Sequence, residues 1–497
     1  MGNDDTRGHP DHGNEPAAAP GGAADYERVQ SDYLERRQLR RGAAGWVLLA
    51  GLGVAYVVSG DFAGWNFGLA QGGWGGLAIA ALLMATMYTC MVFGLAELAT
   101  AMPVAGAGYG FARRALGTLG GFATGTAILI EYAIAPAAIS VFIGGYVESL
   151  GLFGLTNGWP VYLACYLIFV GIHLWGVGEA LKVMLGITAI AVVALLAFVV
   201  GMVPRFSFGN LLDIAPTDAW GASWFLPFGI TGILAALVYG IWFFLAVEGV
   251  PLAAEEARDP KRDMPRGIIG ALSVLLVSAT LMLFVGPGAA GSDAMKASDN
   301  PLPHAVRTAF GGDNWLAQFI NYVGLAGLVA SFFSIIYAYS RMLFALSRAG
   351  YLPRQLSVTG RRKTPYLALI VPATIGFVLA SITKNGALLI NIAVFGATVS
   401  YVLMMLSHIV LRIREPDLPR PYRTPGGVVT TSVALVLATA AVVATFIVDP
   451  KAAAITAGIF VIALGYFWFY SRHHLVANAP EEEFAAIAQA ESELAGD

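Results

Sequence analysis

Charged residues are scarce in this 497-residue chain. Asp, Glu, Lys and Arg make up only 12% of the sequence, whereas hydrophobic residues make up 57%. Soluble domains carry about a quarter of their residues as charges, so this composition excludes a chain built from soluble domains. The net charge of -3 provides no basic field, which argues against nucleic acid as a partner.

Cysteine and the motifs of enzymes are also nearly absent. Cys90 and Cys165 both lie in apolar segments, and no C-x-x-C or Cys/His cluster accompanies them, so we predict no disulfide framework, metal site or cofactor. The sequence has no Gly-rich phosphate loop or nucleophile elbow, which argues against an enzyme. The first forty residues lack the apolar core of a signal peptide, so the first hydrophobic segment is expected to stay in the mature protein.

Long apolar stretches are what the chain has in abundance. They run for about 18 to 25 residues, enough for a helix to cross the roughly 30 Å of hydrocarbon in a bilayer. We therefore predict an all-α membrane protein with twelve transmembrane helices. Their predicted ranges are 43–68, 74–101, 118–148, 159–175, 181–203, 224–253, 267–286, 314–347, 365–382, 386–411, 429–447 and 452–470.

The polar ends and the basic residues predict an orientation. Residues 1–42 are expected to form a disordered arm and residues 471–497 an acidic tail. With these twelve helices, 24 of the 29 Lys and Arg residues fall on one side, and cytoplasmic loops are the ones that collect such residues. Both termini are therefore predicted to be cytoplasmic, in a plasma (inner) membrane.

Two of the predicted helices contain residues that interrupt helices. The first carries glycines, an acid and an amide in residues 58–66 (VSGDFAGWN), and the sixth carries residues 239–244 (YGIWFF) before Glu248. Matching interruptions in two halves of a chain are typical of inverted-repeat transporters, whose site lies at the breaks. The halves would be residues 43–203 and 224–411, with residues 429–470 as two further helices. The alternative is that these glycines only let helices pack closely.

Several motifs together resemble one family, the amino acid/polyamine/organocation superfamily. They are residues 93–99 (FGLAELA), 113–117 (RRALG), 340–343 (SRML), 345–353 (ALSRAGYLP) and 420–423 (RPYR). Within this superfamily, residues 59–66 (SGDFAGWN) and 248–251 (EGVP) are most similar to the ethanolamine permease branch.

The resemblance implies the leucine-transporter type fold, with two inverted five-helix repeats plus two peripheral helices. It implies a secondary active transporter that imports ethanolamine or a similar small amine by alternating access. Amino acid permeases usually carry Gly-Ser-Gly in the first break, and here Val58 replaces the first glycine while Asp61 adds a carboxylate. This departure disfavours substrates that carry a carboxylate. An amino acid or polyamine permease or exchanger is the alternative, and a membrane sensor is a remote one.

Candidate site residues follow from the breaks and from the acids inside the spans. Those predicted to bind substrate are Ser59, Gly60, Asp61, Phe62, Glu131, Tyr132, Tyr239, Gly240, Trp242 and Phe243. Those predicted to couple an ion or support a break are Glu248, Ser331 and Ser334.

Each of these roles has a structural alternative. Asp61 would balance the substrate ammonium, or it would cap free N–H groups at the break. Trp242 and Phe243 would attract the cation by their ring faces, or they would only pack. Glu97, near the end of the second helix, is expected to tie the bundle together. The coupling ion, H⁺ or Na⁺, stays open, because no lysine occurs between Val183 and Met202 to take the place of a sodium ion.

Overall fold

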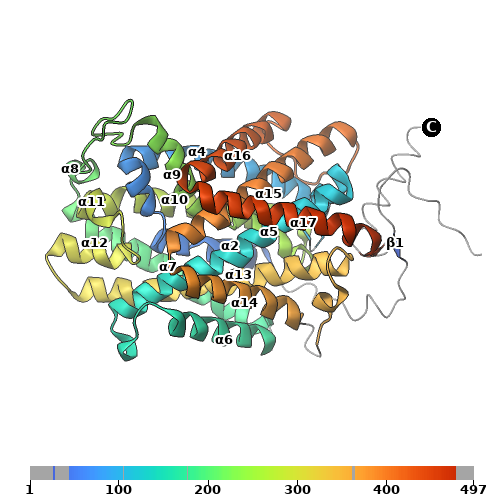
Figure 1. Cartoon of the computed structure of the whole chain (residues 1–497), viewed down its shortest axis with the longest axis horizontal. Helices are drawn as coiled ribbons and strands as arrows, with labels where there is room; N and C mark the ends of the chain where they lie inside the picture. The colour runs from blue at the N-terminus through green and yellow to red at the C-terminus, as the bar shows by residue number, and fades with distance from the viewer. Residues whose placement is uncertain are drawn as a thin grey trace, which may run out of the picture.

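The computed structural model describes residues 26–27, 44–104, 106–175, 177–360, 364–476 and 479, which form a bundle of α-helices (Figure 1). The α-helices are α2 (Trp46–Val57), α3 (Ser59–Phe62), α4 (Phe67–Ala101), α5 (Gly108–Ser149), α6 (Trp159–Trp175), α7 (Val177–Met202), α8 (Phe208–Leu211), α9 (Gly229–Trp242), α10 (Pro260–Ala290), α11 (Ser292–Met295), α12 (Pro301–Phe310), α13 (Trp315–Arg348), α14 (Tyr366–Thr383), α15 (Gly386–Arg414), α16 (Val428–Val448) and α17 (Pro450–Phe469). The 3₁₀ helices are η1 (Leu152–Gly154), η2 (Val203–Arg205), η3 (Val247–Glu256), η4 (Arg354–Ser357) and η5 (Ser471–His473), and the strands are β1 (Tyr26–Glu27) and β2 (Leu475–Val476).

The described helices include many that could span a membrane. Ten helical segments of the described chain are long and apolar enough to do so, which agrees with a multi-pass membrane protein. The first and fourth predicted spans correspond to two shorter apolar helical segments, Trp46–Phe62 and Trp159–Trp175. The prediction of twelve spans therefore stays a prediction.

Several boundaries differ from those predicted, for reasons that lie in single residues. The third span was predicted to begin at residue 118, but α5 already begins at Gly108. Gly117, with φ of 80°, bends this helix without ending it. Gly73 has φ of 66° and separates the first turns of α4 from the long span that follows. Helices α11 and α12 were not predicted, since both are short segments within a polar loop.

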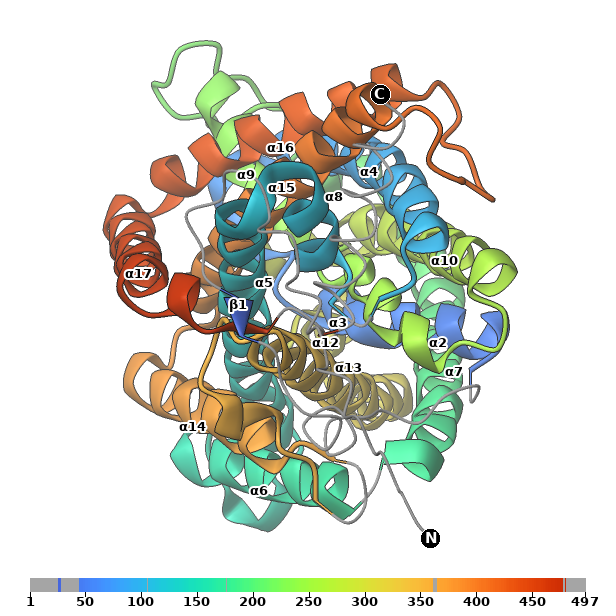
Figure 2. The same cartoon turned by 90° about the vertical axis from the view of Figure 1, so that its right-hand side faces the viewer.

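Views of the bundle show which helices surround the middle. Seen from one end, α3, α5 and α13 lie near the centre, while α6, α14, α16 and α17 lie along the rim (Figure 2). Close helix packing depends on small residues, as is common in membranes. At Gly240 of α9, a side-chain Cβ would lie only 3.0 Å from the backbone of Ala80 in α4.

Both described chain ends lie at the same end of the bundle. Strand β1 pairs in parallel with β2, and the Val476 amide donates to the Ala349 carbonyl over 3.0 Å. The Ser471 hydroxyl donates to the Tyr351 carbonyl over 2.7 Å, and Leu475 is fully buried. Residues 471–476 of the predicted tail thus contain η5 and β2. The other arm and tail residues lie outside the described part of the chain.

We call the end that carries β1 and β2 the strand end, and the end that carries α8, α11 and α12 the loop end (Figure 1).

Candidate functional site

The first membrane segment is broken near its middle. Helix α2 ends at Val57, the single turn α3 follows, and Ala63 is extended with φ of −161° and ψ of 158°. Gly64 then has φ of 97°, a conformation that favours glycine, and a Cβ there would lie 2.4 Å from the indole nitrogen of Trp242. Glycine is therefore required at position 64 by both backbone conformation and space.

The predicted sixth span is also broken. Helix α9 ends at Trp242, Ala246 adopts a left-handed conformation with φ of 77°, and η3 continues the segment. The interruption thus begins at Phe243. Tyr239 and Gly240 lie earlier, inside α9, where Tyr239 contacts Phe67 at a ring distance of 6.3 Å. The structure therefore does not bring these two predicted site residues into the break.

The two breaks contact each other directly. The Trp242 indole N–H donates to the Ala63 carbonyl over 2.9 Å. A Cβ on Gly60 would lie 2.5 Å from the Trp242 carbonyl oxygen, so glycine allows the two backbones to approach. Trp65 and Phe243 stack with ring centroids 5.4 Å apart. The aromatic residues of the second break therefore cover the first.

Helices α5 and α13 hold the first break from two sides. The Tyr146 hydroxyl of α5 donates to the Phe62 carbonyl over 2.9 Å. The Ser59 hydroxyl donates to the Ser331 hydroxyl of α13 over 2.8 Å, and Ser331 donates to the Tyr56 carbonyl over 2.5 Å. Both serine hydroxyls thus donate their protons within the protein.

Asp61 stands in the first break without a partner for its carboxylate. Its side chain is 1% exposed, and neither carboxylate oxygen accepts a hydrogen bond or forms an ion pair within the described chain. Ser278 of α10 faces it, although the Ser278 hydroxyl donates to the Leu275 carbonyl. Because no backbone N–H reaches the carboxylate, the capping alternative is not what this structure shows.

Two further acids form a buried cluster with tyrosines. Glu131 in α5 and Glu248 in η3 are neighbours in this cluster, and neither Glu131 oxygen has a hydrogen-bond partner among the described residues. The Tyr132 and Tyr401 hydroxyls each donate to a different Glu248 oxygen over 3.1 Å, and the Tyr401 and Tyr88 hydroxyls are 2.9 Å apart. Two facing carboxyl groups with no cation among their described partners cannot both ionise, so this pair can hold a proton.

The serines considered for sodium are placed differently from each other. Ser331 points into the first break, as described above. Ser334, one turn further along α13, donates to the Ala330 carbonyl of its own helix over 2.8 Å. In this arrangement each hydroxyl donates its proton to a carbonyl group of the protein.

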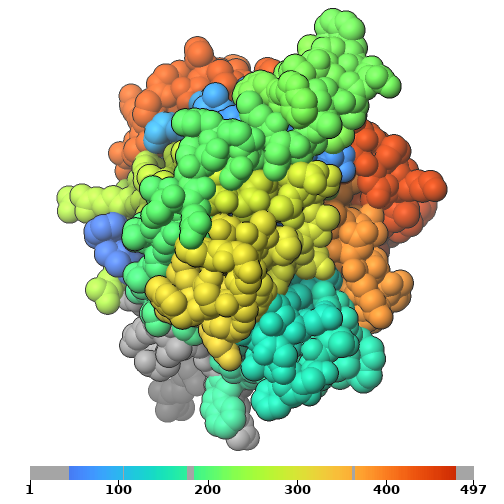
Figure 3. Space-filling view, turned by 90° about the vertical axis from the view of Figure 1, so that its left-hand side faces the viewer, coloured from blue at the N-terminus to red at the C-terminus, as the bar shows by residue number. Residues whose placement is uncertain are grey.

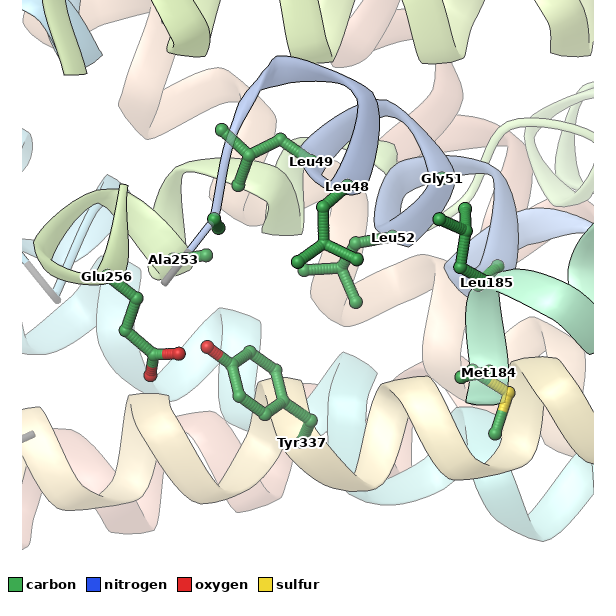
Figure 4. Close-up of a pocket in the computed structure, with 11 residues that line it drawn as sticks. Leu48, Leu49, Gly51, Leu52, Met184, Leu185, Ala253, Glu256 and Tyr337 are labelled. Carbon is green, nitrogen blue, oxygen red and sulfur yellow. The ribbon is translucent and has the colours of Figure 1, made fainter. Parts of the chain in front are cut away.

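Ion pairs close the strand end beneath the breaks. Arg341 of α13 pairs with Glu256 over 2.7 Å, and Arg348 pairs with Glu255 over 2.9 Å. Tyr337 points toward Glu256 beside a cavity of about 10 Å³, no larger than one water (Figure 4). This end is therefore shut.

The loop end is covered by backbone and side-chain contacts. The Asn66 amide nitrogen donates to the Met295 and Ser298 carbonyls over 2.8 and 2.9 Å. In the view onto this end, the yellow surface of α12 and its neighbours covers the middle of the molecule (Figure 3). The breaks are thus enclosed from both ends.

Glu97 serves the structural role expected from the sequence. Its carboxylate pairs with Arg412 over 2.5 Å and with Arg420 over 3.0 Å, and it accepts the Thr424 amide over 2.7 Å. It thereby joins α4 to the end of α15 and the following loop.

Four residues of the site were not predicted. Trp65 lies inside the interrupted stretch, so its position was a usable signal. Tyr146, Ser278 and Tyr401 come from intact helices in which polar residues also occur for packing, so no local pattern marks them.

Comparison with known proteins agrees with this architecture. A family model described as amino acid permease matches residues 48–470. An uncharacterized transporter of Rhizobium meliloti is 29% identical over 80% of this chain and 85% of its own length. The branched-chain amino acid permease BcaP of Bacillus subtilis is 28% identical over 71% and 77%, and the methylthioribose transporter of that organism is 26% identical over 70% and 76%. The chain belongs to the amino acid permease family of membrane transporters.

Proposed function

We propose that this permease imports a small primary amine without a carboxylate, of which ethanolamine is the representative, across the plasma (inner) membrane. The observation that carries the proposal is Asp61. A buried carboxylate in a membrane costs several kcal/mol unless it is paired. Within the described chain no cation pairs with it and the Ser278 hydroxyl is the polar group that faces it, so an ammonium group is a partner that fits.

The aromatic residues around the break suit the same ligand. Trp65 and Phe243 stack beside Asp61, and an ammonium over such a ring gains about 0.5 to 2 kcal/mol. The carboxylate of an amino acid would instead meet the charge of Asp61 at the first break. The site therefore favours amines over zwitterions.

The transport cycle would follow from the two closed ends. We propose twelve transmembrane helices in two inverted five-helix repeats, with the strand end cytoplasmic as the Lys and Arg distribution predicts. Breaking the pairs of Glu255 and Glu256 would open one side, and releasing Asn66 from the α11–α12 loop would open the other. Substrate would exchange at the breaks between these two states.

The coupling ion in this proposal is the proton. The choice is supported by the neighbouring carboxyl groups of Glu131 and Glu248, which could hold one proton between them. A transmembrane proton gradient would then drive accumulation of the amine.

A neutral amino acid is the second candidate substrate. It is favoured by the relatives, one of which is a branched-chain amino acid permease by name. Under this alternative the amino group would contact Asp61, and the substrate carboxylate would need backbone N–H groups at a break.

Uptake by purified protein in liposomes separates the candidates. We expect labelled ethanolamine to accumulate under an inward proton gradient without sodium, and leucine not to compete. Asp61→Asn should abolish both uptake and binding while the protein still folds, since an amide cannot balance an ammonium. Asp218→Asn, an exposed loop substitution, is the matched control. Leucine uptake without ethanolamine uptake, or wild-type affinity in Asp61→Asn, would contradict the proposal.

A further inference from the structure

A basic pocket lies at the strand end, where α10 begins. It has a volume of about 560 Å³, and Lys261, Arg262 and Arg266 of α10 line it together with Trp46 of α2 and Tyr422. Trp and Tyr are the residues that collect at the headgroup level of a bilayer. The pocket therefore combines three cations with two aromatic residues typical of the membrane interface.

These cations differ from the other basic residues at the strand end. Arg114, Arg341 and Arg348 each pair with a glutamate over 2.6 to 2.9 Å. Among the described residues, Lys261 and Arg266 form no ion pair, and Arg262 has only Asp259 at 3.9 Å, with both side chains largely exposed. Within the described chain, the positive charge in the pocket is thus left available for an anion.

A second hollow follows on the same helix. It lies between α7 and α10, has a volume of about 310 Å³ and is almost wholly apolar, with Leu196, Val274 and Val277 among its lining residues. Val274 and Val277 are 41% and 60% exposed. In the view along the bundle, α2, α7 and α10 lie side by side at one edge, where lipid would contact them (Figure 2).

One stripe of α10 connects the two hollows. Arg262, Arg266, Ile269, Ser273 and Val277 follow one another at intervals of three or four residues, so they share a face of the helix. Arg266 and Val277 are eleven residues apart, which is about 16 Å along the axis. This distance takes the stripe from the headgroup level well into the hydrocarbon.

We infer that an anionic phospholipid of the surrounding membrane binds along this stripe. Its phosphodiester would contact Lys261, Arg262 and Arg266, and one acyl chain would lie in the hollow between α7 and α10. The charge of the pocket selects the anion, and the apolar hollow selects a lipid over a soluble phosphate. Ser278 lines the hollow and also faces Asp61, so the bound chain would pack against the wall of the candidate site.

Native mass spectrometry of the full-length, delipidated protein tests this inference by titration with phosphatidylglycerol and with phosphatidylcholine of the same chains. We expect phosphatidylglycerol to bind more tightly. Each cation near a membrane surface contributes about a five-fold effect, so Lys261→Gln/Arg266→Gln should weaken phosphatidylglycerol binding about 30-fold. Arg414→Gln/Arg472→Gln removes the same charge at the same end but outside the pocket, and it should leave binding unchanged.

A second variant tests the apolar part separately. Val277→Trp fills the hollow and keeps all three cations, so it should also weaken phosphatidylglycerol binding. Equal affinity for the two lipids, equal losses in the control variant, or full competition by inorganic phosphate would each overturn the inference. Melting curves of all variants establish that they are folded.

Discussion

Replacing Trp242 by Phe tests how the two breaks are held together. From the sequence alone, a phenyl ring is expected to keep much of the attraction for a cation. In the structure, however, the Trp242 indole N–H donates to the Ala63 carbonyl over 2.9 Å, and the side chain is 2% exposed. Phe removes this donor and leaves a buried carbonyl unpaired, which costs about 1 to 3 kcal/mol. We therefore expect Trp242→Phe to be clearly destabilised and to bind substrate weakly.

Thermal melting in detergent measures the effect. A loss of this size should lower the melting midpoint by about 1 to 4 °C in a chain of this length. Trp315→Phe is the control, because Trp315 is 77% exposed at the start of α13 and should change the midpoint little. The reasoning is refuted if Trp242→Phe has the melting midpoint and the substrate affinity of the wild type. The indole hydrogen bond would then contribute nothing to stability or binding.

Three further perturbations test other parts of the fold. Glu97→Gln leaves two arginines without their buried partner and should cost about 3 to 5 kcal/mol, seen as a lower yield of monodisperse protein. Gly64→Ala should abolish uptake, because its methyl group would clash with an indole ring; normal uptake would show that the break can relax. If the proposed orientation holds, an impermeant thiol reagent should label Asn300→Cys but not Asp417→Cys in intact cells, and the reverse pattern would invert it.

Much of the fold could be predicted because the bilayer imposes simple rules on sequence. The lengths of the apolar stretches predicted the ends of most helices to within a few residues. The glycines in residues 58–66 indicated the first break. Prediction was less accurate where one residue bends a helix without ending it. Gly117 turns α5 while hydrogen bonding resumes beyond it, and apolar length cannot distinguish a bend from a loop.

The candidate site was only partly predictable, for a different reason. Asp61 and Glu131 were conspicuous because acids are rare in membrane spans. Their surroundings depend on which way each helix faces, and apolar length does not show this. Tyr401, for example, is more than 150 residues from Glu248, yet its hydroxyl donates a hydrogen bond to the Glu248 carboxylate. Gly240 was predicted to bind substrate because it lies near a break, and in the structure it packs against α4.

The protein offsets the charge of its buried acids to different degrees. This difference distinguishes acids with a structural role from acids that could bind a substrate. Glu97 has two arginines and a backbone amide, so the protein itself offsets the cost of its charge. Glu248 has two tyrosine hydroxyls and a neighbouring acid, Glu131, with which it can share a proton. Asp61 has neither arrangement among the described residues. A buried acid whose charge the protein does not offset is either protonated or offset by a cation that enters. Our proposal assigns the second role to Asp61, because it lies in the first break beside the residues of the second.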